Sequence, residues 1–149
     1  MSVQIKRFEP GASALPFQLL ANSEDSGGTF LFGEGRLEPG PGPGLHVHAH
    51  EHESFYVIEG VLTMELDGQR LELGAGDYIM CPPGIPHRFS NLTDKLVRVI
   101  GAMSPTGIEK MFEAEAAYFA TLDGPPDLER IAEITEPYGV TILGPPLMA

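Results

Sequence analysis

Glycine and proline divide the middle of this chain into short apolar runs, and the spacing of these turn residues restricts its fold more than any other feature. The chain holds 18 glycines and 14 prolines in 149 residues, and the turns that they mark recur about every 8–12 residues. Apolar and polar residues alternate over 62–66, as in a strand with one buried face, and Asp67-Gly68 is typical of a hairpin turn. Residues 54–58 carry apolar side chains on both faces, which predicts a strand buried between two layers. The chain is therefore expected to be all-β.

The pattern changes near residue 104, where the apolar period shifts from two residues to three or four. This spacing predicts an amphipathic helix over 107–122. Asp127 can cap a second, short helix, and residues 140–143 suit a closing strand. Near the N-terminus, residues 3–8 are predicted to form a short edge strand.

One domain accounts for this organisation. A chain of 149 residues can bury a core of its own, and 42% apolar with 20% charged residues is typical of globular proteins. No repeat, low-complexity tract or linker divides the sequence. We therefore predict a single domain over 1–149, with a β core at about 29–103 and two short helices within about 106–136.

The charge of the chain limits its partners. The formal net charge is −12, which repels nucleic acid and anionic membranes, so neither is expected to bind. No apolar run approaches the roughly 18 residues that a membrane span needs, and the N-terminus lacks the apolar stretch of a signal peptide. The single cysteine, Cys81, has no internal disulfide partner and is expected to be a small buried residue. These features favour a cytoplasmic protein.

Histidines provide the strongest indication of function. Four of the five fall within residues 46–52, and imidazole is the commonest metal ligand in proteins. His46 and His48, two residues apart on a strand, point to the same face. Glu53 has the opposite parity, so it can join them only if the chain turns or bulges between 49 and 52. The fifth histidine, His87, follows a Pro/Gly turn that can aim it at the same point.

These side chains together would form a mixed nitrogen and oxygen ligand set. Three imidazoles and one carboxylate suit one divalent transition metal: Fe, Mn, Co, Ni, Cu or Zn. Four protein ligands on a six-coordinate metal leave two positions for water, substrate or dioxygen, as in catalytic sites.

Polar residues near the predicted site have simpler expected roles. His50 and His52 are expected to be solvated turn residues, although either could serve as a substitute ligand or a proton donor. Glu51 and Glu59 are expected to be surface charges. Asn91 is expected to be a hydrogen-bonding residue of a turn.

The spacing of these residues resembles two motifs of the cupin superfamily. The two patterns are Gly40-x5-His46-x-His48-x4-Glu53-x6-Gly60 and Gly76-x5-Pro82-x-Gly84-x2-His87-x3-Asn91. The resemblance implies a small double-stranded β-helix, or jelly roll, that holds one metal in its mouth. It also implies the ligand set His46, His48, Glu53 and His87.

Residues 53–60 and 138–147 look like small bacterial cupins of the quercetin 2,3-dioxygenase-like branch. That resemblance implies a dioxygenase for a phenolic, flavonoid or enol-type small molecule, in which dioxygen adds to the substrate and a carbon–carbon bond breaks. Glu53 would then be both a ligand and the catalytic base. Strand parity suggests that an apolar substrate pocket is lined by Phe55, Val57, Met64 and Phe89.

Alternatives to a dioxygenase stay open at this point. A cupin with these ligands can be a non-catalytic small-ligand or metal-binding protein, because fold and ligands do not fix the reaction. It can also be an isomerase or a decarboxylase that uses the same metal. Sugar-phosphate isomerisation ranks lower, because parity places none of the cationic candidates Arg36, Arg88 and Arg98 inward. A homodimer is expected, since the apolar helix stripe permits pairing.

Overall fold

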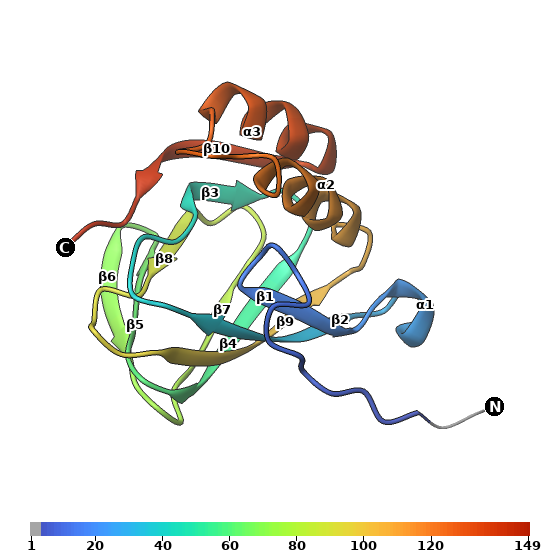
Figure 1. The fold of residues 1–149 in the computed structure, drawn as a ribbon, viewed down its shortest axis with the longest axis horizontal. Coiled ribbons are helices and arrows are strands. Elements are labelled where there is room, and N and C mark those ends of the chain that lie inside the picture. The colour runs from blue at the N-terminus through green and yellow to red at the C-terminus, as the bar shows by residue number, and fades with distance from the viewer. Residues whose placement is uncertain (1–3) are drawn as a thin grey trace.

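The computed structural model describes residues 4–149. Within these residues, two antiparallel sheets face each other (Figure 1). In the first sheet the strand order is β1 (Phe17–Ala21), β2 (Leu31–Leu37), β9 (Val97–Ser104), β4 (His52–Glu59) and β7 (Tyr78–Cys81). In the second it is β10 (Val140–Pro146), β3 (Gly44–His48), β8 (His87–Ser90), β5 (Leu62–Leu66) and β6 (Gln69–Leu73). This architecture confirms the predicted all-β double-stranded β-helix.

The helices are short. They are α1 (Ser23–Ser26), α2 (Glu109–Phe119) and α3 (Leu128–Thr135), and a 3-10 turn (Glu136–Tyr138) follows α3. Asp127 caps α3 as predicted, because its side chain accepts a hydrogen bond from the backbone N–H of Glu129 at 2.9 Å. Within residues 4–149, none of the helices combines the length and the apolar composition that crossing a membrane requires.

The N-terminal part of the fold differs from the prediction. Residues 4–8 form no strand, and residue 3 lies outside the described residues. The edge strand of the first sheet is instead β1, which pairs with β2. The reason is the ring of Phe17: a Cβ on Gly33 of β2 would lie 2.6 Å from its Cζ atom, so only glycine leaves room for the ring. The sheets extend beyond residues 29–103, since β1 and β10 belong to them.

Two turns show why glycine stands where it does. In the β5–β6 hairpin, Asp67 and Gly68 both have positive φ, 50° and 75°, as a tight two-residue hairpin requires. Gly60, after β4, has φ +82°, and a Cβ there would lie 2.6 Å from the carbonyl oxygen of Leu96. Both turns match positions that the sequence marks as breaks.

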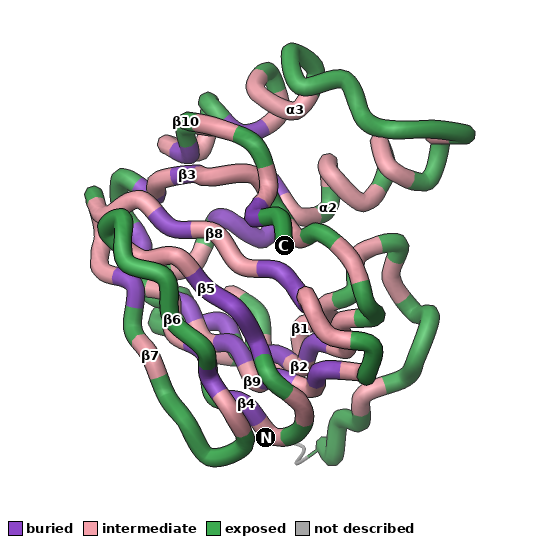
Figure 2. The backbone as a smooth tube through the Cα atoms, turned by 90° about the vertical axis from the view of Figure 1, so that its left-hand side faces the viewer, coloured by how far each residue is buried: buried purple, intermediate pink, exposed green. Residues whose placement is uncertain are grey.

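The core lies between the inward faces of the two sheets (Figure 2). On β4, Phe55 and Val57 are buried, whereas Tyr56 between them is 44% exposed. The prediction that 54–58 is buried on both faces is therefore wrong, because the outer side of this strand lies open to solvent. The buried residues of the core are Phe55, Val57, Leu62, Met64, Leu73, Cys81, Val97 and Val99.

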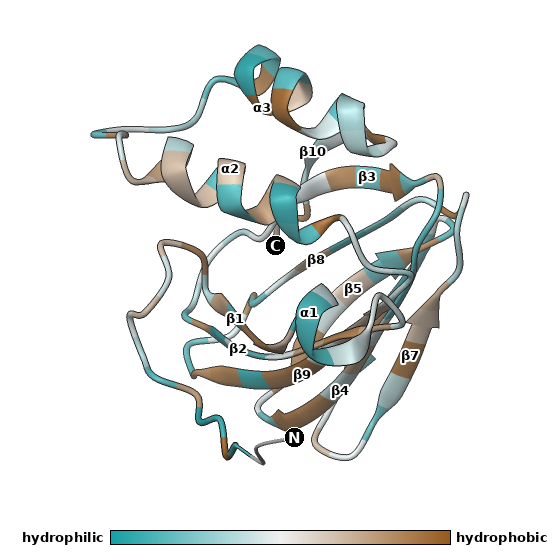
Figure 3. Cartoon of the chain, turned by 90° about the vertical axis from the view of Figure 1, so that its right-hand side faces the viewer, coloured by the Kyte–Doolittle hydropathy of each residue, from teal (hydrophilic) through white to brown (hydrophobic). Residues whose placement is uncertain are grey.

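A second apolar cluster attaches the C-terminal segment to the sheets. It includes Met111 of α2, Val140 of β10 and Leu31 of β2. α3 packs against α2 and against β10, so the two helices lie side by side near one end of the barrel (Figure 3). The predicted closing strand is confirmed as β10, which pairs with β3. β3 carries two of the candidate ligands, so this segment supports the site from outside.

Candidate metal centre

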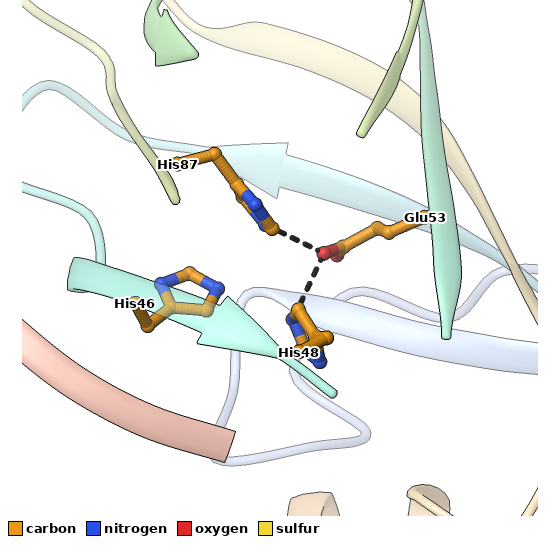
Figure 4. Close-up of side chains that lie close together, drawn as sticks. All are labelled: His46, His48, Glu53 and His87. Atoms are coloured by element: carbon orange, nitrogen blue, oxygen red, sulfur yellow. Dashed lines mark hydrogen bonds and ion pairs between the residues drawn. The ribbon is translucent and has the colours of Figure 1, made fainter. Parts of the chain in front are cut away.

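Four side chains converge from both sheets onto one point inside the barrel (Figure 4). His46 and His48 come from β3 and His87 from the start of β8, all in the second sheet. Glu53 comes from β4 in the first sheet. Their candidate ligand atoms all lie within 4.8 Å of one another. The structure thus brings together the four residues that the sequence singled out.

The change of strand phase that this convergence needs is present. Residues 49–51 lie outside the strands, and β4 begins at His52. Glu53 consequently faces inward with Phe55 and Val57, as predicted. Hydrogen bonds to neighbouring turns hold this corner: the N–H of Ala49 donates to Gly139 at 2.9 Å.

Glu53 lies at the centre of the cluster. Its Oε2 atom is 2.9 Å from Nε2 of His87 and 3.1 Å from Nε2 of His48. Side-chain exposure is 14% for Glu53, 4% for His48 and 1% for His87. A carboxylate shielded from water in this way needs the positive or polar groups around it.

Backbone carbonyls orient two of the three imidazoles. Nδ1 of His46 donates to the carbonyl of Gly44 at 2.7 Å, and Nδ1 of His87 donates to the carbonyl of Ile85 at 3.2 Å. A carbonyl can only accept, so each bond assigns the proton to Nδ1. The Nε2 atoms of these rings are therefore the ones suited to bind a metal.

The cluster has strongly shifted pKa values. Burial acts to raise the pKa of Glu53, but hydrogen bonds and charge from His48 and His87 outweigh it, so its net pKa is lowered. Burial, together with His87, lowers the pKa of His46 to about 4. Burial also acts to lower the pKa of His48, yet Glu53 and Glu51 outweigh it and raise this pKa. At neutral pH His46 is therefore uncharged, as a metal ligand must be.

The residues present fit a divalent transition metal. Both ring nitrogens of His48 are buried. Among the described residues, Nε2 has only the Glu53 carboxylate as a partner, at 3.1 Å, and Nδ1 makes no hydrogen bond, which leaves Nε2 available to bind a metal together with Glu53. The donor set combines imidazole nitrogens with one carboxylate, which suits Fe, Mn, Co, Ni, Cu or Zn.

The structure corrects one of the simpler assignments. His50, His52 and Glu59 are exposed, as expected, although His52 is the first residue of β4 and not part of the turn. Glu51 was expected to be a surface charge, and this is wrong, because it is only 5% exposed. It lies in the turn between β3 and β4, and its Oε2 atom is 3.5 Å from Nδ1 of His48. Strand parity cannot find such a residue, since it applies only within a strand.

The roles expected for Cys81 and Asn91 agree with the structure. Cys81 is buried, and burial, with Glu53 nearby, raises the pKa of its thiol to about 12. Such a thiol is unreactive at neutral pH. The side-chain amide of Asn91 donates to the carbonyls of Leu37 and Lys95 at 2.8 and 2.7 Å, so it closes a turn.

Of the four predicted pocket residues, Phe55 and Val57 lie on β4 and Phe89 on β8, which carry ligands, and Met64 lies on the neighbouring strand β5. Phe55 and Phe89 are two residues beyond Glu53 and His87, and their ring centroids are 5.1 Å apart. Met64 pairs with Phe89 across the β5–β8 ladder. Val57 and Met64 are completely buried in the core, so of the four, the two aromatic rings lie nearest in sequence to the ligands. That these residues contact a substrate stays a prediction.

Sequence comparison relates this chain to proteins of known class. Residues 33–103 match the family model described as a Cupin domain. A stretch of 60 residues is 38% identical to quercetin 2,3-dioxygenase of Bacillus subtilis, which is 40% of this chain and 18% of that enzyme. The chain spans less than half the length of the curated relatives that it matches.

Solved structures agree with the fold. A Cupin 2 conserved barrel domain protein from Salinispora arenicola is 24% identical, with a TM-score of 0.61, over 81% of this chain and 98% of that one. A predicted oxalate decarboxylase from Thermotoga maritima is 25% identical, with a TM-score of 0.56, over 58% of this chain and 76% of that one. The first of these proteins is described by its fold alone and the second by a predicted activity, so the similarities support the barrel more strongly than any one reaction.

Proposed function

We propose that this chain, whose residues 33–103 match the Cupin domain model, is a cytoplasmic metal-dependent cupin dioxygenase for a phenolic, flavonoid or enol-type small molecule. The observation that carries the proposal is the convergence of three imidazoles and one carboxylate inside the barrel. A bound Fe, Mn, Co, Ni or Cu ion would supply open positions for a substrate oxygen and for dioxygen. The 60-residue similarity to a quercetin 2,3-dioxygenase supports this reaction class.

Glu53 would be the base that activates the substrate. The Glu53 carboxylate is ionised at neutral pH, and it would accept the proton of a phenol or enol hydroxyl whose acidity a bound cation raises. The two imidazoles at 2.9 and 3.1 Å from Oε2 hold this oxygen at the centre of the cluster. Removal of the proton leaves an electron-rich enolate or phenolate, the form that reacts with dioxygen. In the net reaction both oxygen atoms enter the products and one carbon–carbon bond breaks.

The surroundings of the cluster favour an aromatic substrate. The rings of Phe55 and Phe89 lie next along the strands that carry Glu53 and His87. Phe55 is buried in the core and Phe89 is half-buried against it, so the part of the barrel next to the cluster is apolar and aromatic, as a flat apolar ligand requires. The cationic side chains that a sugar phosphate would need are directed elsewhere, since Arg88 pairs with Glu65 and Arg98 with Glu34.

An oxygen-electrode assay tests the proposal. Metal-free protein is loaded separately with Fe(II), Mn(II), Co(II), Ni(II) and Cu(II) and mixed with a panel of flavonols and smaller enols. We expect oxygen uptake with at least one metal and its loss in Glu53→Gln, whereas the matched control His52→Gln, in an exposed residue one position away, keeps it. If no metal and no substrate gives uptake, the protein is better described as a small-ligand or metal-binding cupin.

A decarboxylase is the second candidate, favoured by the similarity to the predicted oxalate decarboxylase of Thermotoga maritima. The two reactions differ in their gas balance. A decarboxylase releases carbon dioxide from a carboxylic acid without net oxygen uptake, so adding oxalate and other small dicarboxylates, with carbon dioxide release measured beside oxygen uptake, separates them.

A further inference from the structure

A second carboxylate is buried beside the candidate metal centre. Glu51 lies in the turn between β3 and β4 and is 5% exposed, although its neighbours His50 and His52 are both exposed. Burial of a carboxylate costs free energy unless a partner compensates it. The position of Glu51 therefore calls for a specific partner.

The polar partner of Glu51 is Nδ1 of His48, the ring nitrogen on the side away from Glu53. Oε2 of Glu51 lies 3.5 Å from Nδ1 of His48, and the two side chains are 6% and 4% exposed. Each of these two atoms is buried and has no other hydrogen-bond partner. A small rotation of either side chain could therefore bring these two atoms into a hydrogen bond without breaking another one. On the other side of the ring, Nε2 faces Glu53 and the rest of the cluster.

We propose that Glu51 is a positioning residue that accepts the Nδ1–H of His48 and so holds Nε2 towards the metal. The inference rests on the proposed metal site. It completes a pattern in the cluster, because Nδ1 of His46 and of His87 is already bonded to a backbone carbonyl, whereas Nδ1 of His48 has none. Glu51 is the corresponding acceptor for the third ring. Because Glu51 is charged, a hydrogen bond to it makes the His48 ring a stronger electron donor to a metal than a hydrogen bond to a backbone carbonyl would.

This arrangement predicts a graded response to substitution of Glu51. Leucine fills similar space but accepts nothing, so Glu51→Leu should weaken metal binding about 10- to 100-fold, the usual loss for such an outer partner. Glutamine keeps an acceptor oxygen and loses the charge, so Glu51→Gln should show a smaller loss. Glu72→Leu, at an exposed carboxylate of β6, is the matched control and should bind as the wild type does.

The experiment uses zinc(II) as a diamagnetic probe of the full chain. Its affinity is measured by competition with a chelator, and NMR of the zinc-loaded protein, labelled with nitrogen-15, follows the imidazole protons. We expect His48 to bind zinc through Nε2 and to show an Nδ1–H that exchanges slowly with water in the wild type and in Glu51→Gln. In Glu51→Leu that proton should exchange fast or disappear, while the amide spectrum shows a folded barrel.

The outcomes separate this inference from the proposed function. If zinc binds tightly and Glu51→Leu changes neither the affinity nor the His48 proton, the inference is wrong and the metal site stands. Binding of zinc through Nδ1 of His48 also overturns it. If Glu51 behaves as proposed but no metal supports oxygen uptake, the dioxygenase proposal fails alone. If the wild type binds no zinc, both fail.

Discussion

The burial of His46 has a measurable consequence for the stability of the metal-free protein. In the folded chain the pKa of His46 is lowered to about 4, first because burial destabilises the imidazolium and then because His87 is close. In the unfolded chain the same group titrates near 6.5. Below pH 6.5 the unfolded chain therefore binds a proton that the folded chain refuses, so acidification destabilises the fold.

The size of this effect follows from the two pKa values. One pKa unit corresponds to 1.36 kcal/mol, so the gap between them makes His46 cost about 3 kcal/mol of stability between pH 7 and pH 4. His48 acts in the opposite direction: its pKa is raised, and the stability that this gives is present below pH 6.5 and is lost above it. A variant that removes only His46 is thus needed to measure the contribution of His46 separately from that of His48.

Urea unfolding of the wild type and of His46→Gln, in the presence of a chelator, measures the contribution of His46 to the free energy of unfolding. The chain has no tryptophan and four tyrosines, so circular dichroism and tyrosine fluorescence are the appropriate probes. We expect the stability of the wild type relative to His46→Gln to fall by about 3 kcal/mol as the pH falls from 7 to 4. A difference that is the same at both pH values would show that His46 is not buried in the way described.

Three further expectations can be checked separately. His87→Ala should remove most of the bound metal in elemental analysis and His52→Ala should not; equal loss would mean that the ligand set is wrong. Met64→Ala should lower the free energy of unfolding by about 2–5 kcal/mol, because Met64 is completely buried, and a loss well under 1 kcal/mol in urea titration would contradict this packing. The expected homodimer should appear in light scattering, supported by the exposed Tyr78 and Met80 on the edge strand β7; a monomer at all concentrations would exclude it.

Much of the candidate site could be predicted from the sequence because its ligands obey simple strand geometry. His46 and His48 share a face by the two-residue period of a strand. Glu53 has the wrong parity, and this mismatch itself predicted a change of phase over 49–52, which the structure contains between β3 and β4. The parity of Phe55 and Val57, which are both buried, follows from the same break.

The sequence could not predict features that depend on packing between distant segments. Glu51 was predicted to be a surface charge because it lies in a polar turn. Only the fold shows that its side chain is buried with Oε2 3.5 Å from Nδ1 of His48. Strand β1 escaped detection because its place in the sheet depends on the ring of Phe17 filling the space left by Gly33 and Gly101. Tyr56 appeared to belong to a doubly buried strand, since its apolar character does not reveal whether another layer covers it.

The convergence of ligands also depends on how the barrel closes. The three histidines belong to one sheet and Glu53 to the other, so the register within one sheet does not set the distance between the carboxylate and the imidazoles. Their distance is set by the two sheets packing on the shared core that includes Val57, Met64 and Leu62. Because this core forms from apolar burial alone, the ligand cluster can be assembled before any metal binds, with the Glu53 carboxylate compensated by His48 and His87. The three histidines and Glu53 would then hold a divalent metal with the loss of the imidazole protons that face Glu53 and without reordering of the chain.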